Sequence, residues 1–343
     1  MAEVAAQWPP DTDIALVTPE GWVDTRTAPL PLWLQAPLDY HRLIPLPEQN
    51  ALYAQLNMVS DTDKETLDQF GARILEQVRA SNPRTVVLDL RLNQGGNGDL
   101  RNGLIADLIR AQDADTRLVV LTGRGTFSAS EFILEDLDRL TDAIFVGEPA
   151  SSRPISYGDA YQAKLPNSHI TVRISTRYWQ SGQDKRPYIP IDLAAPLAFA
   201  DYVSSRDPAL EAALSYRPGP DLLQQLSQAA TKAGPDAAAK AAEAYVDDPA
   251  HRYRDVQFEL IMAEQLLLDE KQGDAALTVS RWSAARFPRN SDLATVLAYV
   301  ADQQGAKNEA RKAIATALAI DPNNRSAQSL SESIAPKTKG AAN

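Results

Sequence analysis

Apolar and polar positions follow two alternating patterns along the first two thirds of the chain. Short apolar runs, typical of strands buried on both faces, alternate with stretches in which apolar residues recur every three or four positions, as on one helix face. This alternation predicts a mainly parallel sheet with right-handed crossovers. Strands are predicted over 52–58, 85–92, 118–121 and 143–146, and helices over 63–80, around Leu104, Leu108 and Ile109, and over 129–140.

The pattern changes near residue 215. From 216 to 335 the sequence is rich in Ala, Leu and Gln, with helical periodicity and few strand-forming residues. Pro288 and Pro322, each at the end of a predicted helix, lie 34 residues apart, which is the period of tetratricopeptide repeats. We predict an all-α tetratricopeptide-like domain here, with a generic alanine-rich helical bundle as the alternative.

The two ends of the chain differ from both parts. Residues 1–45 are rich in proline, with short strand-like pieces at 13–17 and 21–24, and are expected to be the remnant of an upstream PDZ-like or cap region. An α/β core over 46–215 follows, and residues 336–343 are expected to be a disordered tail. The first residues lack the basic flank and apolar stretch of a secretory signal, so an extracytoplasmic or periplasmic location is expected only if a longer parent chain carries one.

Composition removes several kinds of chemistry. The 343 residues include no cysteine, and the three histidines, at 41, 169 and 251, are too scattered for a metal pair at helical spacing. We therefore expect no metal and no cofactor. A net charge of −11 argues against nucleic-acid binding, and no apolar run is long enough to predict a transmembrane segment. Hydroxyls, carboxylates, amines and backbone groups remain, and the oligomeric state is open.

Two turns that follow predicted strands carry unusual residues. The first, NQGGNG from Asn93, places Gly95 and Gly96 where consecutive amides can bind an anion. The second, GRGTFSASE, places Ser128 just before a predicted helix. If the two strands are neighbours, a hydroxyl nucleophile meets an oxyanion site. The alternative, which spacing alone favours, is a capping box in which Ser128 caps the helix and Glu131 is its partner.

Several blocks between about residues 50 and 214 resemble the tail-specific, or C-terminal processing, serine peptidases, including the tricorn-like and interphotoreceptor retinoid-binding-protein-like branch. The resemblance implies a crotonase-like α/β core, with Ser128 as the nucleophile and the amides of Ala129 and of Gly95 or Gly96 as the oxyanion hole. We also assign Arg153 and Asn93 to substrate binding. The blocks that carry the resemblance are 53–57, 89–97, 126–131, 146–149, 157–159, 165–168, 175–179, 201–202 and 206–210.

The general base is the departure from this family. The lysine of one branch corresponds to Arg153, and a guanidinium cannot accept the serine proton. The tricorn-like branch uses an upstream histidine with an acidic partner near a later Pro-Asp motif, for which Asp184 is the candidate here. No residue of this chain stands out as the base. His41 is expected on the surface or at an interface, His169 on a hairpin turn, His251 at a helix start and Lys164 in a loop. Glu131 and Glu148 qualify only if burial raises their pKa.

The resemblance implies a serine-type peptidase that cleaves peptides or proteins through Ser128. We expect it to be weak or inactive in this chain because the upstream base-bearing segment is absent. The alternative is a non-catalytic pseudopeptidase that binds peptides or proteins, with the helical repeats as a surface for a protein partner. An acyl-CoA enzyme of the wider crotonase superfold is a third reading, by fold analogy only.

Overall fold

The computed structural model describes residues 29–113, 115–180 and 184–334. The chain divides into two compact units, Met1–Tyr216 and Arg217–Asn343. The predicted strand-like pieces at 13–17 and 21–24 and the predicted tail at 336–343 lie outside the described residues.

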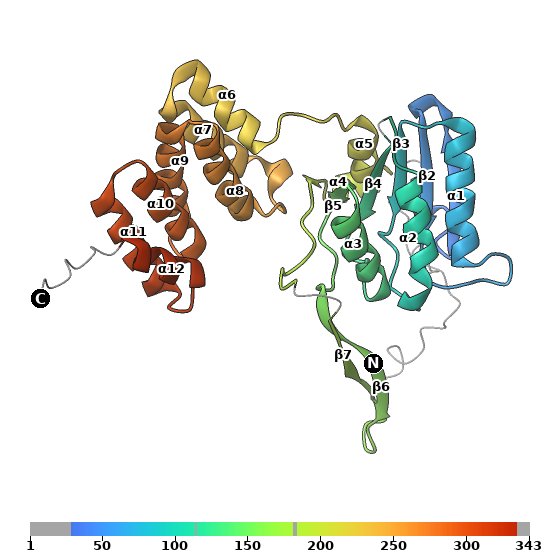
Figure 1. The fold of residues 1–343 in the computed structure, drawn as a ribbon. Coiled ribbons are helices and arrows are strands. Elements are labelled where there is room, and N and C mark those ends of the chain that lie inside the picture. The colour runs from blue at the N-terminus through green and yellow to red at the C-terminus, as the bar shows by residue number, and fades with distance from the viewer. Residues whose placement is uncertain (1–28, 114, 181–183, 335–343) are drawn as a thin grey trace, which may run out of the picture. The chain divides into compact units, whose positions relative to one another are not determined.

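The first unit is built on a six-stranded sheet (Figure 1). Only β1 and β2 pair antiparallel, and every other neighbouring pair is parallel, which confirms the predicted, mostly parallel sheet. All residues of β3 are buried because the sheet is covered on both faces. In sheet order the strands are β1 (His41–Leu46), β2 (Ala51–Leu56), β3 (Thr85–Asp89), β4 (Arg117–Thr122), β5 (Ile144–Gly147) and β8 (Leu193–Ala194).

Three helices connect the parallel strands and lie side by side over one face of the sheet: α1 (Leu67–Ser81), α2 (Arg101–Arg110) and α3 (Ala129–Leu140) (Figure 1). The other face packs against α5 (Pro208–Ser215), and a short α4 (Phe199–Val203) precedes it. Helix α1 begins at Leu67, later than predicted, because the Thr66 hydroxyl caps the Gln69 amide and the Gln69 side chain bonds back to Thr66.

The end of the predicted lead-in belongs to this unit. Strand β1 pairs with β2 along its whole length, Leu34 is buried, and the carbonyl of Trp33 accepts a hydrogen bond from Gln55. The prediction that residues 1–45 are separate from the core is therefore wrong for 29–45. The sequence concealed β1 because Pro45 interrupts its pattern, which an edge strand tolerates.

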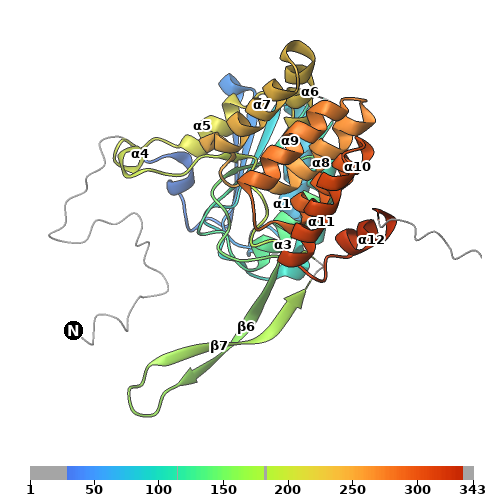
Figure 2. The ribbon, with the colours of Figure 1, turned by 90° about the vertical axis from the view of Figure 1, so that its left-hand side faces the viewer.

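A long hairpin forms a second, two-stranded sheet from β6 (Ile155–Lys164) and β7 (Thr171–Gln180). In Figures 1 and 2 it extends away from the helices of this unit. Near its base the Trp179 ring lies 5.5 Å from the ring of Phe132 on α3. Tyr157 pairs with Tyr178, and both are more than half exposed. The hairpin begins directly after Arg153, so it starts beside the predicted site.

The second unit is helical over its described residues, as predicted. Its elements recur at a regular distance: α9 and α11 begin at residues 273 and 307, 34 apart. The turns repeat as well, since Asn290 bonds to Gln257 and Asn324 bonds to Ser291, one period later. No described helix is long and apolar enough to cross a membrane. The helices are α6 (Leu222–Ala233), α7 (Pro235–Asp247), α8 (Val256–Asp269), α9 (Gly273–Arg286), α10 (Ser291–Gln303), α11 (Lys307–Ile320) and α12 (Arg325–Ile334).

Candidate active site

The two unusual turns meet at the carboxyl ends of neighbouring strands. Strands β3 and β4 are parallel and adjacent, so the turns that follow them lie at one edge of the sheet. The carbonyl of Asn93 accepts the Phe127 N–H at 3.0 Å and the Ser130 hydroxyl at 3.0 Å. A Cβ built on Gly95 would lie only 2.7 Å from the Cβ of Ser128. The glycine at this position therefore lets the two turns touch.

Asn93 holds the glycine turn in place. Its side chain is fully buried, its Nδ2 donates to the Leu56 carbonyl at 3.0 Å, and its Oδ1 accepts the Gly95 N–H at 2.9 Å. Both functional groups of the amide are thus engaged within the protein. The structure gives Asn93 a positioning role and not the substrate contact expected from the sequence.

Ser128 occupies a strained position between β4 and α3. Its φ of 60° and ψ of −120° lie outside the backbone regions that residues other than glycine usually adopt. This conformation costs about 1–3 kcal/mol. Its side chain makes no capping hydrogen bond, so the capping-box alternative is wrong. Among the described residues the hydroxyl has no hydrogen-bond partner, and the residue is half-buried. A strained strand-to-helix turn of this kind presents a serine Oγ to a substrate.

Two backbone amides near Ser128 have no partner within the described part of the chain: those of Gly96 and Ala129. The Gly95 amide is already bonded to Asn93, so Gly95 provides space beside Ser128 and its N–H is not available. Gly96 has a φ of 134°, and a Cβ there would lie 2.2 Å from the Val59 carbonyl oxygen. Hydrogen bonds between Val59 and both neighbours of Gly96 hold this turn.

A buried carboxyl lies beneath the serine. Glu131 is 1% exposed, its Oε2 accepts the Ser152 hydroxyl at 3.3 Å, and the Ser152 Oγ accepts the Ser128 N–H at 3.2 Å. Burial, and then the charge of Glu135, raise the pKa of Glu131 to about 8. From the sequence, Glu131 was a candidate base only if burial raised its pKa, and the structure meets this condition. The motif S-x-x-E, from Ser128 to Glu131, places this acid near the serine, but the same spacing is also typical of a helix cap.

Asp184 is engaged with an arginine. Both of its oxygens accept the Arg186 Nε, at 3.1 and 2.9 Å, and Arg186 also pairs with Asp138. Partial burial opposes ionisation, but the hydrogen bonds from Arg186 outweigh it and hold the pKa of Asp184 below its ordinary value. None of the interactions described for Asp184 involves an imidazole. Arg153 is exposed and forms no ion pair with another described residue.

His41 is not on the surface, contrary to the prediction. Its side chain is 3% exposed, its ring stacks on Phe70 at 4.9 Å, and its Nδ1 lies 3.3 Å from the Glu65 Oε2. Burial lowers the pKa of His41, although Glu65 opposes the shift. Among the described residues, no hydrogen bond or ion pair joins His41 to Ser128. A strand position with an apolar helix above it explains this burial, which the sequence around His41 does not signal.

Of the other candidates, His169 lies on a hairpin turn as predicted, whereas the predictions that His251 starts a helix and that Lys164 lies in a loop are wrong. His169 is exposed at the hairpin turn with a φ of 57°, and Lys164 is exposed at the end of β6. His251 ends a short 3-10 helix, with its Nδ1 2.9 Å from the Tyr245 carbonyl oxygen. Glu148 pairs with Arg124 at 2.9 Å. None of these is connected to Ser128 by a hydrogen bond within the described residues.

A buried ionic cluster anchors the end of β3, and sequence reasoning did not assign it a role. Arg91 bonds to Asp89 and, at 2.7 Å, to Asp207, while the Tyr53 hydroxyl donates to Asp89 at 2.7 Å. Despite burial, the two carboxylates hold the pKa of Arg91 above its ordinary value. Asp207 also caps α5. The cluster ties the end of β3, where the glycine turn begins, to β2 and to the start of α5.

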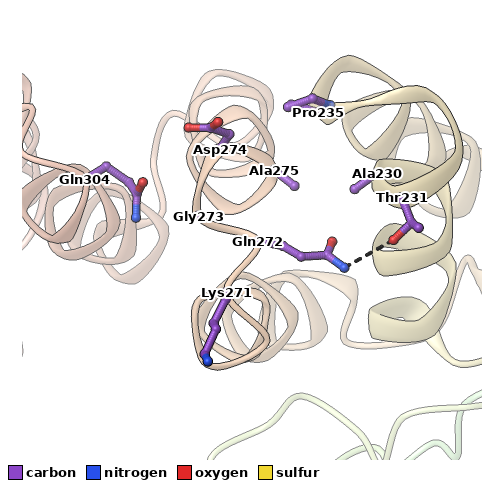
Figure 3. Close-up of a pocket in the computed structure, with 9 residues that line it drawn as sticks. All are labelled: Ala230, Thr231, Pro235, Lys271, Gln272, Gly273, Asp274, Ala275 and Gln304. Atoms are coloured by element: carbon purple, nitrogen blue, oxygen red, sulfur yellow. Dashed lines mark hydrogen bonds between the residues drawn. The ribbon is translucent and has the colours of Figure 1, made fainter.

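Each unit also has a surface depression. One, of about 250 Å³, lies beside the turn at 123–125 and is lined by Trp33, Arg91 and Gly147 among others. The other, of about 340 Å³, lies in the helical unit, where Gln272 donates to Thr231 at 3.4 Å (Figure 3). None of the residues predicted to be catalytic lines the second depression.

Comparison with known proteins yields distant structural similarity only. No family model and no curated protein matches the chain. A candidate peptidase from Parabacteroides merdae is 17% identical (TM-score 0.39), covering 52% of this chain and 65% of its own. A photosystem II C-terminal processing protease is 21% identical (TM-score 0.32; 42% of each chain), and a lipoprotein from Streptococcus agalactiae is 15% identical (TM-score 0.28; 40% and 57%). The chain thus spans less than two thirds of each of these structures, and at these scores they do not identify its activity.

Proposed function

We propose that the first unit is a serine-type peptidase of the tail-specific, tricorn-like kind, with a crotonase-like core, and that it acts by acyl transfer through Ser128. One observation carries this proposal. Ser128 has a strained backbone and an unengaged hydroxyl, and it adjoins the unpartnered amides of Gly96 and Ala129. A helix cap needs none of these features, whereas a nucleophile beside an oxyanion hole needs all of them.

In this mechanism the Ser128 Oγ attacks the carbonyl carbon of a peptide bond. The carbonyl oxygen becomes an oxyanion and accepts hydrogen bonds from the Gly96 and Ala129 amides, each contributing on the order of 10² to 10³ in rate. The positive end of the α3 dipole favours the same charge. The C–N bond then breaks, the amine leaves with a proton, and water hydrolyses the acyl-enzyme.

We propose low activity at neutral pH. Arg153 occupies the position of the lysine base of one branch, and a guanidinium stays protonated. His41 is engaged with Glu65 and Phe70. These positions therefore supply no group that removes the Ser128 proton at pH 7.

The second candidate is a binding protein without turnover, and the helical unit favours it. Helices and turn hydrogen bonds that recur every 34 residues support a tetratricopeptide-like array, whose stacked helices present an extended surface to a protein partner. The depression at Gln272 lies on this unit. Peptide binding without hydrolysis would also agree with Arg153 in place of a base.

A fluorophosphonate probe, which reacts with activated serines, separates the two candidates. We expect slow labelling of the whole chain that disappears in Ser128→Ala and persists in the control Ser168→Ala, since Ser168 is exposed at the hairpin tip. Slow cleavage of unstructured peptides should follow the same pattern. Peptide binding that is equal in the chain and in Ser128→Ala, with no labelling of either, would support the binding protein.

A further inference from the structure

Glu131 is a buried acid that the mechanism above leaves unused. It lies on the first turn of α3, and its backbone N–H donates to the Ser128 carbonyl at 2.9 Å. Its Oε1 is buried and accepts no hydrogen bond from any residue that the structure describes. Because a buried carboxyl oxygen without a partner is costly, its position calls for an explanation beyond packing.

Ser152 connects this carboxyl to the serine. Its side chain is 6% exposed, and its Oγ lies between the Ser128 N–H, at 3.2 Å, and the Glu131 Oε2, at 3.3 Å. The neighbouring Ser151 is tied to the Thr126 carbonyl by its N–H at 2.9 Å, which holds this segment against the Ser128 turn. A hydroxyl that both donates and accepts protons thus lies beside the nucleophile and the acid.

The charges around Glu131 come from α3 and from the segment that follows the hairpin. Glu135 lies one turn further along α3, and Asp184 and Arg186 lie after β7, with Arg186 shared between Asp184 and Asp138. Burial, Glu135 and Asp184 favour the protonated carboxyl, while Ser152 and Arg186 favour the carboxylate. The balance raises the pKa of Glu131 to about 8, so that about one tenth is ionised at pH 7.

We propose that Ser152 and Glu131 form the proton relay for Ser128 in the proposed peptidase reaction, with Ser152 held next to the nucleophile by the Ser128 backbone N–H and Glu131 acting through Ser152. In this relay the unengaged Ser128 hydroxyl turns to the second lone pair of the Ser152 Oγ. As the Ser128 Oγ bonds to the carbonyl carbon, its proton passes to the Ser152 Oγ and the Ser152 proton passes to the Glu131 carboxylate. When the C–N bond breaks, the proton returns along the same path to the leaving amine. No co-reactant except water is needed. The inference rests on the proposed function and explains low activity at neutral pH.

The test is the rate of fluorophosphonate labelling of Ser128 as a function of pH in the full chain. We expect the wild-type rate to rise with a midpoint near pH 8. Glu131→Gln and Ser152→Ala should lose this rise, with labelling at about pH 9 lowered roughly 10² to 10³-fold. Glu135→Gln should keep the rise but shift its midpoint to lower pH, because it removes a charge that disfavours the Glu131 carboxylate. If Glu131 had only a structural role, Glu135→Gln would not move the midpoint of the labelling rate. Glu148→Gln, whose partner is Arg124, is the matched control and should leave the profile unchanged.

The outcomes separate the relay from the proposed function. A wild-type profile in both Glu131→Gln and Ser152→Ala overturns the relay and leaves the peptidase proposal standing. No Ser128-dependent labelling at any pH overturns the peptidase proposal and the relay with it. If Glu131→Gln does not fold, the midpoint shift in Glu135→Gln decides, and an unshifted midpoint there overturns the relay.

Discussion

Within the part of the chain that the structure describes, each unit buries one glutamate, and the two sites look alike at first. Glu131 is 1% exposed and Glu264 is 0% exposed, and each accepts a serine hydroxyl, from Ser152 at 3.3 Å and from Ser280 at 2.7 Å. Within the described residues, the Oε1 of each has no hydrogen-bond partner. Burial is the main cause that raises the pKa of Glu131 to about 8 and that of Glu264 to about 7.

The surroundings separate them. Glu264 lies on α8 and faces Ser280 and Ser283, which lie within the regular helix α9. Glu131 lies beneath Ser128, whose φ is positive, and next to the amides of the glycine turn. A raised pKa thus marks a buried acid in both units. Only in the first does strained backbone with unpartnered amides supply something for the acid to act on.

The largest expected effect concerns Glu131 and stability. A carboxyl whose pKa is raised on folding keeps its proton in the native state after the unfolded chain has lost it, so stability falls as pH rises from about 4.5 to about 8 and is level above. The loss is about 5 kcal/mol. Glu131→Gln, neutral at every pH, should abolish it. Hydrogen exchange of the α3 and β4 amides measures this; an equal fall in the variant would contradict the assignment.

Glu264→Gln should have a smaller effect, confined to the helical unit. The raised pKa of Glu264 again makes stability fall as pH rises, here between about pH 4.5 and about pH 7. The substitution should remove this fall in the free energy of unfolding, which is about 3 kcal/mol. Exchange of the α8 and α9 amides should show it. Labelling of Ser128 should not change, and a change would mean that the two buried acids are not functionally distinct.

Two glycines with positive φ give a matched pair. Gly96→Ala places a Cβ 2.2 Å from the Val59 carbonyl oxygen, so the turn must shift and Ser128 labelling should fall about 10²-fold. Gly305→Ala, at a φ of 77° with open space around it, should cost only about 1 kcal/mol in the helical unit. Labelling rates and thermal unfolding measure both. Equal labelling of Ser128 in the two variants would show that the glycine turn does not contribute to the reaction of Ser128.

The smallest effect is expected for Arg153→Lys. The substitution restores the residue type of the lysine-using branch, but the position is exposed. An exposed lysine keeps its proton at neutral pH, because no desolvation lowers its pKa. Labelling of Ser128 at pH 7 should therefore change less than about threefold. A large gain in rate would show that position 153 reaches the nucleophile and that the relay through Ser152 is not needed.

Much of the fold could be predicted because burial on both faces gives strands a distinctive pattern. Strands β2 to β5 and helices α1 to α3 were predicted within a few residues. Strand β1 was missed because Pro45 breaks its pattern. The hairpin turn at His169 was predicted, but the bounds of its two strands were not, because no core covers Tyr157 or Tyr178. For Ser128, spacing favoured a helix cap, since S-x-x-E fits both roles. The backbone φ of 60° and the missing cap bond decided otherwise.

The sequence by itself determined the available chemistry: no thiol, one serine before a helix, and glycines after a strand, in blocks that resemble a peptidase family. Only the tertiary structure decided which amides have no partner, which acid is buried and which arginine holds Asp184. The physical reason is that desolvation and hydrogen bonding depend on neighbours from distant parts of the chain. Ser152 reaches Ser128 and Glu131 across 24 and 21 residues, a contact that no local pattern encodes.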